Sequence, residues 1–73
     1  MLDRLDRRLL KAINANENGR VFDVIKPLLS EKSSHALRDR LKALAREGYV
    51  ILEKQRANVL VSLTAAGKQE TEA

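Results

Sequence analysis

The feature that most constrains the fold is a pair of β-forming runs near the end of the chain. Residues 49–53 are mainly apolar and β-branched, and residues 58–63 alternate apolar with polar side chains. Only the polar residues 54–57 separate the two runs, so together they predict an antiparallel hairpin. Because an isolated hairpin is only marginally stable in water, this one must pack against helices formed by the preceding residues.

The first residues predict an amphipathic helix. Apolar residues recur at spacings of three and four, as one helical face requires: Leu2, Leu5, Leu9, Leu10 and Ile13. Asp3 and Asp6 lie in the first turns, where a negative charge interacts favourably with the helix dipole. The turn-forming residues 14–19 end the helix. We expect its leucines in the core, although some of them can instead pack against a second subunit.

The clearest element is a helix over His35–Glu47. Its N-cap is either Ser33 or Ser34, and Gly48 is placed to end it. Its apolar face consists of Leu37, Leu41, Leu44 and Ala45. The opposite face carries polar and charged side chains, namely His35, Arg38, Asp39, Lys42 and Arg46. The helix therefore turns one face to a core and presents the other to a solvent or a partner.

The segments on either side of this helix are less regular. Residues 23–30 predict a short helix that starts late, after an extended piece over residues 20–22, because Pro27 is tolerated only in a first helical turn. Residues 64–67 predict one last helical turn, and residues 68–73 predict a frayed tail.

The length of 73 residues allows one domain, which we assign to residues 1–67. A chain this short has a thin core, which dimerisation would help to stabilise. The sequence contains no cysteine, which excludes disulfides and thiolate chemistry and fits a cytoplasmic location. No apolar run approaches the ~18 residues that a membrane span needs, and the charged N-terminus does not resemble a signal peptide.

The net charge of +4 suits a polyanionic partner. Residues 1–14 carry +2 and residues 33–56 carry +3, whereas residues 15–32 are neutral and residues 57–73 carry −1. The positive charge is therefore concentrated in the first helix and in the segment from the clearest helix to the hairpin turn.

The order of elements, with these residues, resembles the winged helix-turn-helix superfamily of transcription regulators. The opening Leu2–Leu10, followed by Gly19–Arg20, resembles the DNA-binding half of Lrp/AsnC regulators. The segment Leu37–Val50 is similar to the recognition helix and exit turn of many members. Leu63–Gly67 resembles the "LTxxG" segment that follows the wing in MarR- and PadR-like proteins. The match covers residues 2–67.

The resemblance implies an α+β fold, mainly α, in which a three-helix winged helix-turn-helix ends in a C-terminal two-stranded antiparallel wing. The second helix departs from the pattern, because it lacks the usual small residue and turn glycine and has Pro27, Glu31 and Lys32 nearby. No effector-binding domain follows residue 67, so we expect no amino-acid sensing, no small-molecule effector and no cofactor.

The resemblance also implies that helix 34–47 enters the major groove of double-stranded DNA. Arg38 is the first candidate for a base contact, because a guanidinium group can bind guanine O6 and N7 together. Ser34 and His35 lie at the N-terminal end of the helix, which usually reaches deepest. Asp39 either accepts a hydrogen bond from a cytosine amino group or orients Arg38.

Further polar residues are candidates for contacts to the DNA backbone. Lys42 and Arg46 lie further along the helix and are expected at phosphates. The wing over residues 54–58 reaches a minor groove or the backbone through Lys54, Gln55 and Arg56. Each assignment competes with a simpler one, since a charged helix face is often only solvated, and this alternative is most open for His35 and Asp39.

Other arginines have their own alternatives. Arg40 can lie flat on the hairpin and pair with Glu53 or Glu47. The arginines of the first helix either touch phosphate or, more simply, form a solvated face: Arg4, Arg7 and Arg8.

Catalysis and metal binding find no support in the sequence. The single histidine has neither a cysteine nor an obvious serine–acid partner, and the three glycines form no phosphate loop. No cluster of His, Asp or Glu has metal-ligand spacing. We therefore expect a protein that is not an enzyme and has no metal site.

The leading hypothesis is a sequence-specific DNA-binding regulator that acts as a homodimer, associated with the nucleoid of a prokaryote or with a virus. The alternative is a winged-helix module for protein interaction or dimerisation without specific DNA binding. Non-specific or single-stranded binding is a third reading, which the shortage of aromatics disfavours, since only Phe22 and Tyr49 are present.

Overall fold

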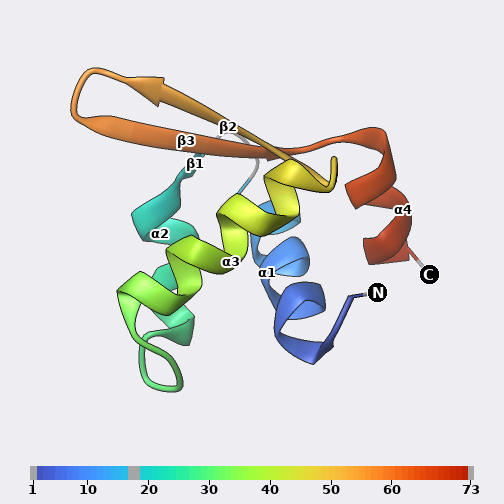
Figure 1. Ribbon diagram of the computed structural model, residues 1–73, viewed down its shortest axis with the longest axis horizontal. Coiled ribbons are helices and arrows are strands. Elements are labelled where there is room, and N and C mark those ends of the chain that lie inside the picture. The colour runs from blue at the N-terminus through green and yellow to red at the C-terminus, as the bar shows by residue number, and fades with distance from the viewer. Residues whose placement is uncertain (1, 17–18, 73) are drawn as a thin grey trace.

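The computed structural model describes residues 2–16 and 19–72. Its elements are α1 (Arg4–Ala15), β1 (Gly19–Arg20), α2 (Val21–Ile25), the 3₁₀ helix η1 (Lys26–Leu28), α3 (Ser34–Arg46), β2 (Val50–Gln55), β3 (Asn58–Leu63) and α4 (Ala65–Glu72). The β2–β3 hairpin lies along one side of the helices, and its turn extends past them (Figure 1). The predicted order of helices followed by a hairpin is confirmed.

α1 begins with a reciprocal capping box. The Asp6 backbone N–H donates to Asp3 Oδ1 at 2.9 Å, and the Asp3 N–H donates to Asp6 Oδ2 at 3.2 Å. The predicted apolar stripe forms part of the core, because Leu2 and Leu9 are buried and Leu5 is half-buried. Leu2 and Leu9 are therefore not available to a second subunit.

α2 begins earlier than the sequence predicted. Instead of a helix over residues 23–30, α2 starts at Val21, directly after β1, and gives way to 3₁₀ geometry at Lys26. Pro27 lies at the start of η1, where its missing N–H costs little. The start was missed because Arg20, the N-cap, makes no side-chain capping bond. This helix is stabilised instead by burial of its apolar face, and such burial cannot be recognised from a local capping pattern.

α3 matches the predicted helix within one residue at each end. Ser33 is the N-cap, and its Oγ accepts a hydrogen bond from the Ala36 N–H at 3.1 Å. Gly48 follows the last turn with a φ of +89°, a left-handed conformation that glycine adopts without steric cost. One face of α3 is fully buried through Leu37, Leu41 and Leu44.

The sheet has one more strand than the predicted wing. In the described part of the chain it is antiparallel, with the order β1-β3-β2. Val61 of the central strand pairs with Gly19 of β1 and with Leu52 of β2. The extended piece expected before α2 therefore forms a short edge strand, which ties the start of α2 to the hairpin.

The hairpin turn is shorter than the four residues predicted. Lys54 and Gln55 belong to β2, where they pair with Val59 and Asn58, so the turn consists of residues 56–57. The first turn residue, an arginine, has a φ of +51°, which two-residue hairpin turns require but which only glycine, asparagine and aspartate adopt easily. Without a glycine, the sequence carried no signal for this turn.

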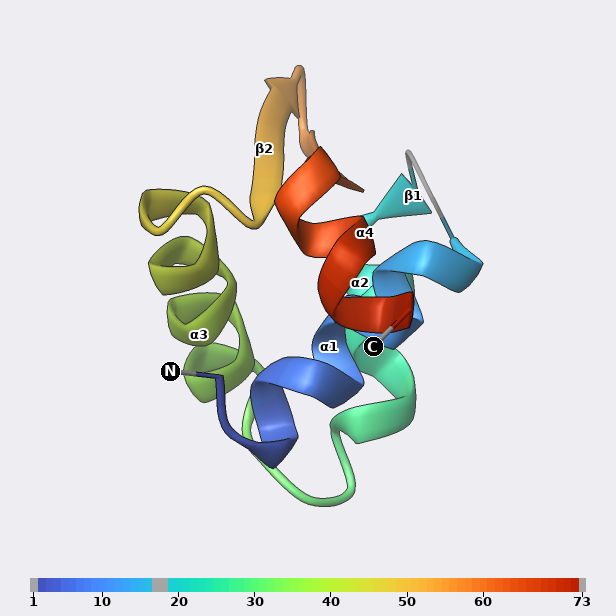
Figure 2. The ribbon, with the colours of Figure 1, turned by 90° about the vertical axis from the view of Figure 1, so that its right-hand side faces the viewer.

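The prediction of a frayed tail is wrong for residues 68–72, because α4 continues to Glu72, and Ala73 lies outside the described residues. α4 packs against α1 (Figure 2), and Glu70 Oε2 lies 3.8 Å from Arg7 Nη1. The Gly67 N–H donates to Thr64 Oγ1 at 3.1 Å at the start of the helix. The partner surface for this helix comes from the other end of the chain, so local sequence does not disclose it.

The elements enclose one aliphatic core. It takes side chains from α1 and the residues before it, and from α2, η1, α3 and both hairpin strands: Leu2, Leu9, Leu10, Ile13, Val21, Val24, Ile25, Leu28, Leu37, Leu41, Leu44, Val50, Val61 and Leu63. Within residues 2–16 and 19–72, none of the helices combines the length and the hydropathy of a membrane-spanning segment.

Candidate nucleic-acid interface

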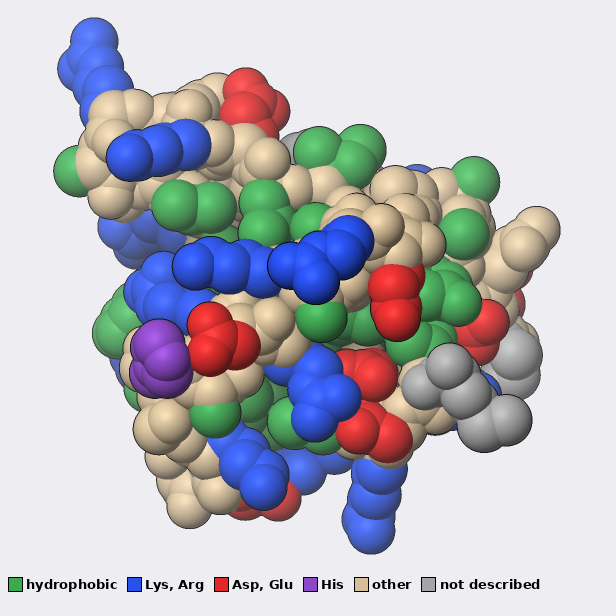
Figure 3. All heavy atoms as spheres, viewed as in Figure 1, with side chains coloured by type: hydrophobic (Ala, Val, Ile, Leu, Met, Phe, Trp, Pro, Cys, Tyr) green, Lys and Arg blue, Asp and Glu red, His purple; other side chains and the backbone are tan. Residues whose placement is uncertain are grey.

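The face of α3 that points away from the core carries the predicted contact residues. Lys and Arg side chains run along this helix and stand at the tip of the hairpin on the same side of the molecule (Figure 3). Arg38 is half-buried, and the other candidates on the helix are exposed: Ser34, His35, Asp39, Lys42 and Arg46. All of them therefore remain accessible to a ligand of α3.

Arg38 is held in place by a residue one turn earlier. Its Nε donates to Ser34 Oγ at 3.3 Å, which fixes the direction of the guanidinium group and leaves its terminal nitrogens free of that bond. One of the two roles predicted for Asp39 was to orient Arg38. That alternative is wrong in this structure, because Asp39 Oδ2 instead lies 3.1 Å from His35 Nε2.

The His35–Asp39 pair lies at the entrance to α3. Both side chains are largely exposed, with 89% of the histidine and 55% of the aspartate side chain accessible. The pair carries an ionic attraction only when the histidine is protonated. In the free protein, each side chain therefore limits how the other can present itself to a ligand.

The wing residues lie on the strand and turn furthest from α4. Arg56 occupies the turn itself, and Lys54 and Gln55 precede it at the end of β2. Gln55 Nε2 donates to Glu53 Oε1 at 3.1 Å, so its amide is already engaged within the strand. Lys54 and Arg56 are the two cations that the hairpin presents near its tip.

A groove separates α3 from the hairpin. It has a volume of about 240 Å³ and is lined by residues of both elements, including Arg38, Leu41 and Lys42 on the helix and Leu52 and Val59 on the hairpin. Helix and wing thus form two walls of one surface. Of the predicted contact residues, Arg38 and Lys42 line this groove, whereas His35, Arg46 and Arg56 do not.

A second hollow of about 260 Å³ lies at the start of α2. Arg38 lines both, and the second also contains Arg20 and Phe22. Neither residue was predicted to contact DNA. In the sequence, an aromatic residue two positions after an arginine was a signal for such a site. The positions of Arg20 and Phe22 depend on β1, however, and the sequence pattern did not establish β1 as a strand.

Arg40, in contrast, does not belong to this surface. The sequence suggested a pairing with Glu53 or Glu47, whereas Arg40 Nη1 lies 3.2 Å from Asp3 Oδ2 and Arg40 Nε lies 3.5 Å from Asp6 Oδ1. Both partners belong to the capping box of α1. The crossing of α1 and α3 determines this pairing, so sequence spacing did not indicate it.

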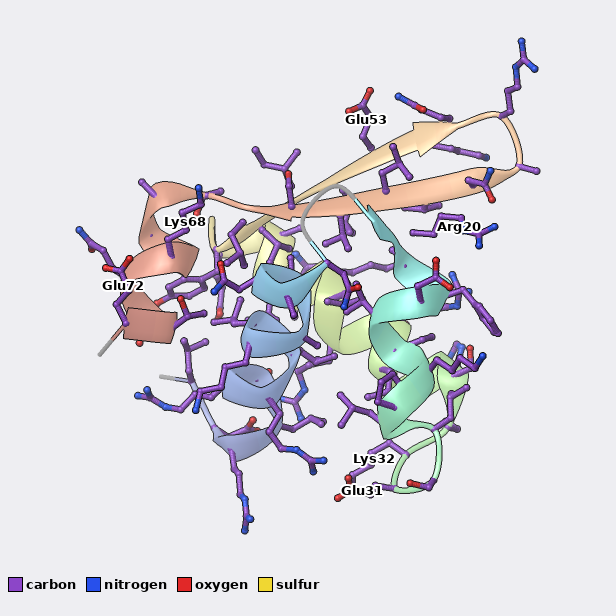
Figure 4. All side chains as sticks on the ribbon, turned by 180° about the vertical axis from the view of Figure 1, so that it is seen from behind. Arg20, Glu31, Lys32, Glu53, Lys68 and Glu72 are labelled. Carbon is purple, nitrogen blue, oxygen red and sulfur yellow. The ribbon has the colours of Figure 1, made fainter. Side chains whose placement is uncertain are left out.

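Two arginines of α1, Arg7 and Arg8, form ion pairs away from this surface. Arg8 forms a bidentate pair with Glu31, with 2.7 Å between Nη1 and Oε1, and this hydrogen bonding lowers the pKa of the Glu31 carboxyl and raises the pKa of the Arg8 guanidinium. Glu31 and Lys32 lie in the loop at the end of the molecule opposite the hairpin (Figure 4). This pairing and that of Arg7 with Glu70 fit the simpler alternative of a solvated helix face.

Comparisons with known proteins agree with this geometry. A family model described as "Winged helix DNA-binding domain" matches residues 2–67. Among solved structures, the crystal structure of SSV1 F-93 is similar, with a TM-score of 0.81 and 25% sequence identity over 97% of this chain and 81% of that chain. No curated protein sequence matches the chain. The narrower resemblance to Lrp/AsnC regulators stays a prediction.

Proposed function

The chain belongs to the winged helix DNA-binding domain family, and we propose that it is a sequence-specific transcription regulator that inserts α3 into the major groove of double-stranded DNA. In this proposal the wing lies on the adjacent backbone or minor groove. The match over residues 2–67 identifies a winged-helix DNA-binding domain. The proposal goes further in two respects, namely that the protein prefers a particular DNA sequence and that α3 binds in the major groove.

The observation that supports these claims best is the position of Arg38. Its guanidinium emerges from the outward face of α3, is oriented by Ser34, and lies beside the groove between helix and hairpin. A side chain that is held in one direction loses less conformational entropy when it binds. A fixed guanidinium suits the bidentate contact to guanine O6 and N7.

The neighbouring residues have separate roles in this proposal. Ser34 and His35 approach the base edges at the N-terminal end of α3, and Asp39 accepts from a cytosine amino group once it leaves His35. Phosphate contacts come from the remaining cations and from the wing amide: Lys42, Arg46, Lys54, Gln55 and Arg56. Each cation that neutralises a phosphate steepens the log–log salt dependence of binding by about 0.9.

A homodimer completes the proposal. Two copies related by a two-fold axis would present two α3 helices about 34 Å apart, one helical turn of DNA, on a pseudo-palindromic site. Sedimentation equilibrium of the free protein and of its complex measures the number of subunits. One monomer per selected duplex would remove this part of the proposal.

Selection of bound duplexes from a random pool at physiological salt tests the sequence preference. Fluorescence anisotropy then compares the selected duplex with a scrambled one. Arg38→Ala is expected to weaken binding to the selected duplex by about 1–3 kcal/mol and to relax the preference at one G·C pair. Lys42→Gln is the matched control, since loss of a phosphate contact weakens both duplexes equally. If Arg38→Ala bound the selected duplex as tightly as the wild type, Arg38 would not read the sequence.

A further inference from the structure

The hollow at the start of α2 brings together side chains from three separate parts of the chain. Arg20 and Phe22 come from β1 and α2, Arg38 comes from α3, and Asn58 and Val59 come from β3. Val21, Arg38 and Val59 also line the groove between α3 and the hairpin, so the two hollows share three side chains. We call the hollow lined by Arg20, Phe22, Arg38 and Asn58 the α2–wing groove.

Phe22 is the unusual member of this groove. Half of its surface, 51%, is exposed, although the other large side chains of α2 are buried. Leu29 and Ile51 are also exposed large hydrophobic residues, at 37% and 54%, but neither lines this groove. An aromatic face left in water beside cations suits a ligand that is apolar in one part and anionic in another.

Arg20 supplies a cation to the lining of the same groove. Figure 4 shows its side chain beside the hairpin, near the start of α2. Arg20 Nε lies 3.2 Å from Asp23 Oδ2, and the arginine side chain is 57% exposed. A guanidinium has five N–H donors, so a bond through Nε leaves its terminal nitrogens able to bind an anion. Asp23 is the acidic group next to this cation, and it competes with such an anion for Arg20.

We infer that the α2–wing groove binds the sugar–phosphate backbone of one DNA strand, alongside the strand edge that α3 contacts. Arg20 and the Asn58 amide donate to phosphate oxygens, and the ring of Phe22 packs on the apolar face of a deoxyribose. The inference rests on the proposed function and adds two contact residues to it. Because every nucleotide carries the same sugar and phosphate, these contacts position the duplex and do not read its sequence.

This assignment makes Asp23 an inhibitory neighbour. The carboxylate lies within reach of Arg20 and would repel a phosphate bound there. Removing its charge while keeping its shape should therefore strengthen binding, which few surface substitutions do. The expected gain distinguishes a phosphate site from a merely structural Arg20–Asp23 pair.

The test is anisotropy titration of the full chain with the selected and the scrambled duplex at several salt concentrations. Arg20→Gln is expected to weaken both duplexes equally, by about tenfold, and to reduce the salt slope by about 0.9. Phe22→Ala should weaken both by about threefold to tenfold, the loss expected for apolar area of this size. Asp23→Asn should strengthen both by about threefold.

Matched controls come from a similar pair at the other end of the fold. Arg7 and Glu70 form an exposed ion pair between α1 and α4, so Arg7→Gln and Glu70→Gln change the same charges away from the groove. Ile51→Ala removes an equally exposed hydrophobic side chain outside it. These three variants should bind DNA as the wild type does. Circular dichroism checks that each variant is folded, and Phe22→Gln replaces Phe22→Ala if the latter is not.

The outcomes separate this inference from the proposed function. If Arg20→Gln and Phe22→Ala bind like the wild type while Arg38→Ala is weakened, the groove does not hold DNA and the proposed function stands. Weaker DNA binding by Asp23→Asn would also contradict the inference that the α2–wing groove binds the DNA backbone. If the wild-type protein shows no salt-dependent affinity for any duplex, the proposed function itself is wrong.

Discussion

A Cβ atom added to Gly67 would lie 2.1 Å from the carbonyl oxygen of Tyr49. The backbone of α4 therefore passes directly over the residue that follows Gly48, at the exit of α3. Thr64 connects the same two segments, since its hydroxyl donates to the Gly48 carbonyl at 2.6 Å and accepts from the Gly67 N–H at 3.1 Å. This contact gives a physical reason for the threonine and glycine spacing in Leu63–Gly67.

Gly67→Ala is expected to lower the free energy of unfolding by about 1–3 kcal/mol, because the backbone must move to admit the methyl group. The direction is informative, since alanine is otherwise the better helix former by about 1 kcal/mol. Ala66→Gly, at an exposed neighbouring position, should lose about 1 kcal/mol through helix propensity alone. Urea denaturation measures both variants. A higher midpoint for Gly67→Ala would show that the close contact is absent in solution.

Arg40→Gln is expected to destabilise the fold by about 1–3 kcal/mol, because it leaves the Asp6 carboxylate without its cation. Asp6 is only 5% exposed, and its Oδ1 has no hydrogen-bond partner in the described part of the chain apart from the ion-pair contact at 3.5 Å. In a double-mutant cycle, Asp6→Asn should recover part of the loss. Arg46→Gln is the control on the same helix, with an expected change within about 0.5 kcal/mol.

Stability should fall in acid partly through Asp3 and Glu31. The Asp6 backbone N–H lowers the pKa of the Asp3 carboxyl, and the Arg8 side chain lowers that of Glu31. A carboxyl group with a lowered pKa in the folded state stabilises the fold above its unfolded pKa, and this contribution is lost as pH falls through the folded pKa. Asp3→Asn combined with Glu31→Gln should therefore flatten the decline below about pH 4. Thermal melts at several pH values between neutral and acidic measure this loss of stability. If the double variant lost stability with falling pH as steeply as the wild type, Asp3 and Glu31 would not be its cause.

Arg56→Gly should change stability and DNA binding in opposite directions. Glycine relieves the positive φ of this turn residue, which costs a non-glycine residue about 1 kcal/mol or more. Loss of the guanidinium should reduce affinity for any duplex and lower the salt slope by about 0.9. Arg56→Asn, which also tolerates the turn, is the second variant. Equal affinity for wild type and Arg56→Gly would place the wing tip away from DNA.

Ser33 and Ser34 are adjacent serines with different expected roles. Ser33→Ala removes the N-cap bond of α3 and should cost about 1 kcal/mol of stability. Ser34→Ala removes the acceptor for Arg38 and should weaken binding to the selected duplex by about 0.5–1.5 kcal/mol with little change in stability. The two variants thus control for each other in a pair of melts and titrations. Identical effects of both would show that Ser34 acts only on the helix.

The elements that the sequence predicted well are those whose signals are local. The apolar periodicity of α1 and α3, the serine before α3 and the glycine after it all act within a few residues. The outward face of α3 followed directly from the same periodicity. The candidate residues on that face could therefore be named from sequence alone.

What the sequence did not predict depends on distant parts of the chain. The pairings of Arg40 with Asp3 and of Arg7 with Glu70 exist only once α1 meets α3 and α4. The α2–wing groove likewise needs β1 to join β3 before Arg20 comes near Arg38. Tertiary packing also moved the start of α2, whose N-cap Arg20 makes no side-chain capping bond, and extended α4 to Glu72, beyond the single turn that the sequence predicted.

The hydroxyl of Thr64 has a consequence for how such a domain can diversify. If α3 and the hairpin both contact DNA as proposed, the distance from the tip of the hairpin to the start of α3 sets the length of duplex that one copy covers. Thr64 holds the joint between these two elements from the side that faces α4. In the proposed complex, exposed side chains on α3 can therefore be exchanged, and the preferred base pairs with them, while the length of duplex that the protein covers stays the same.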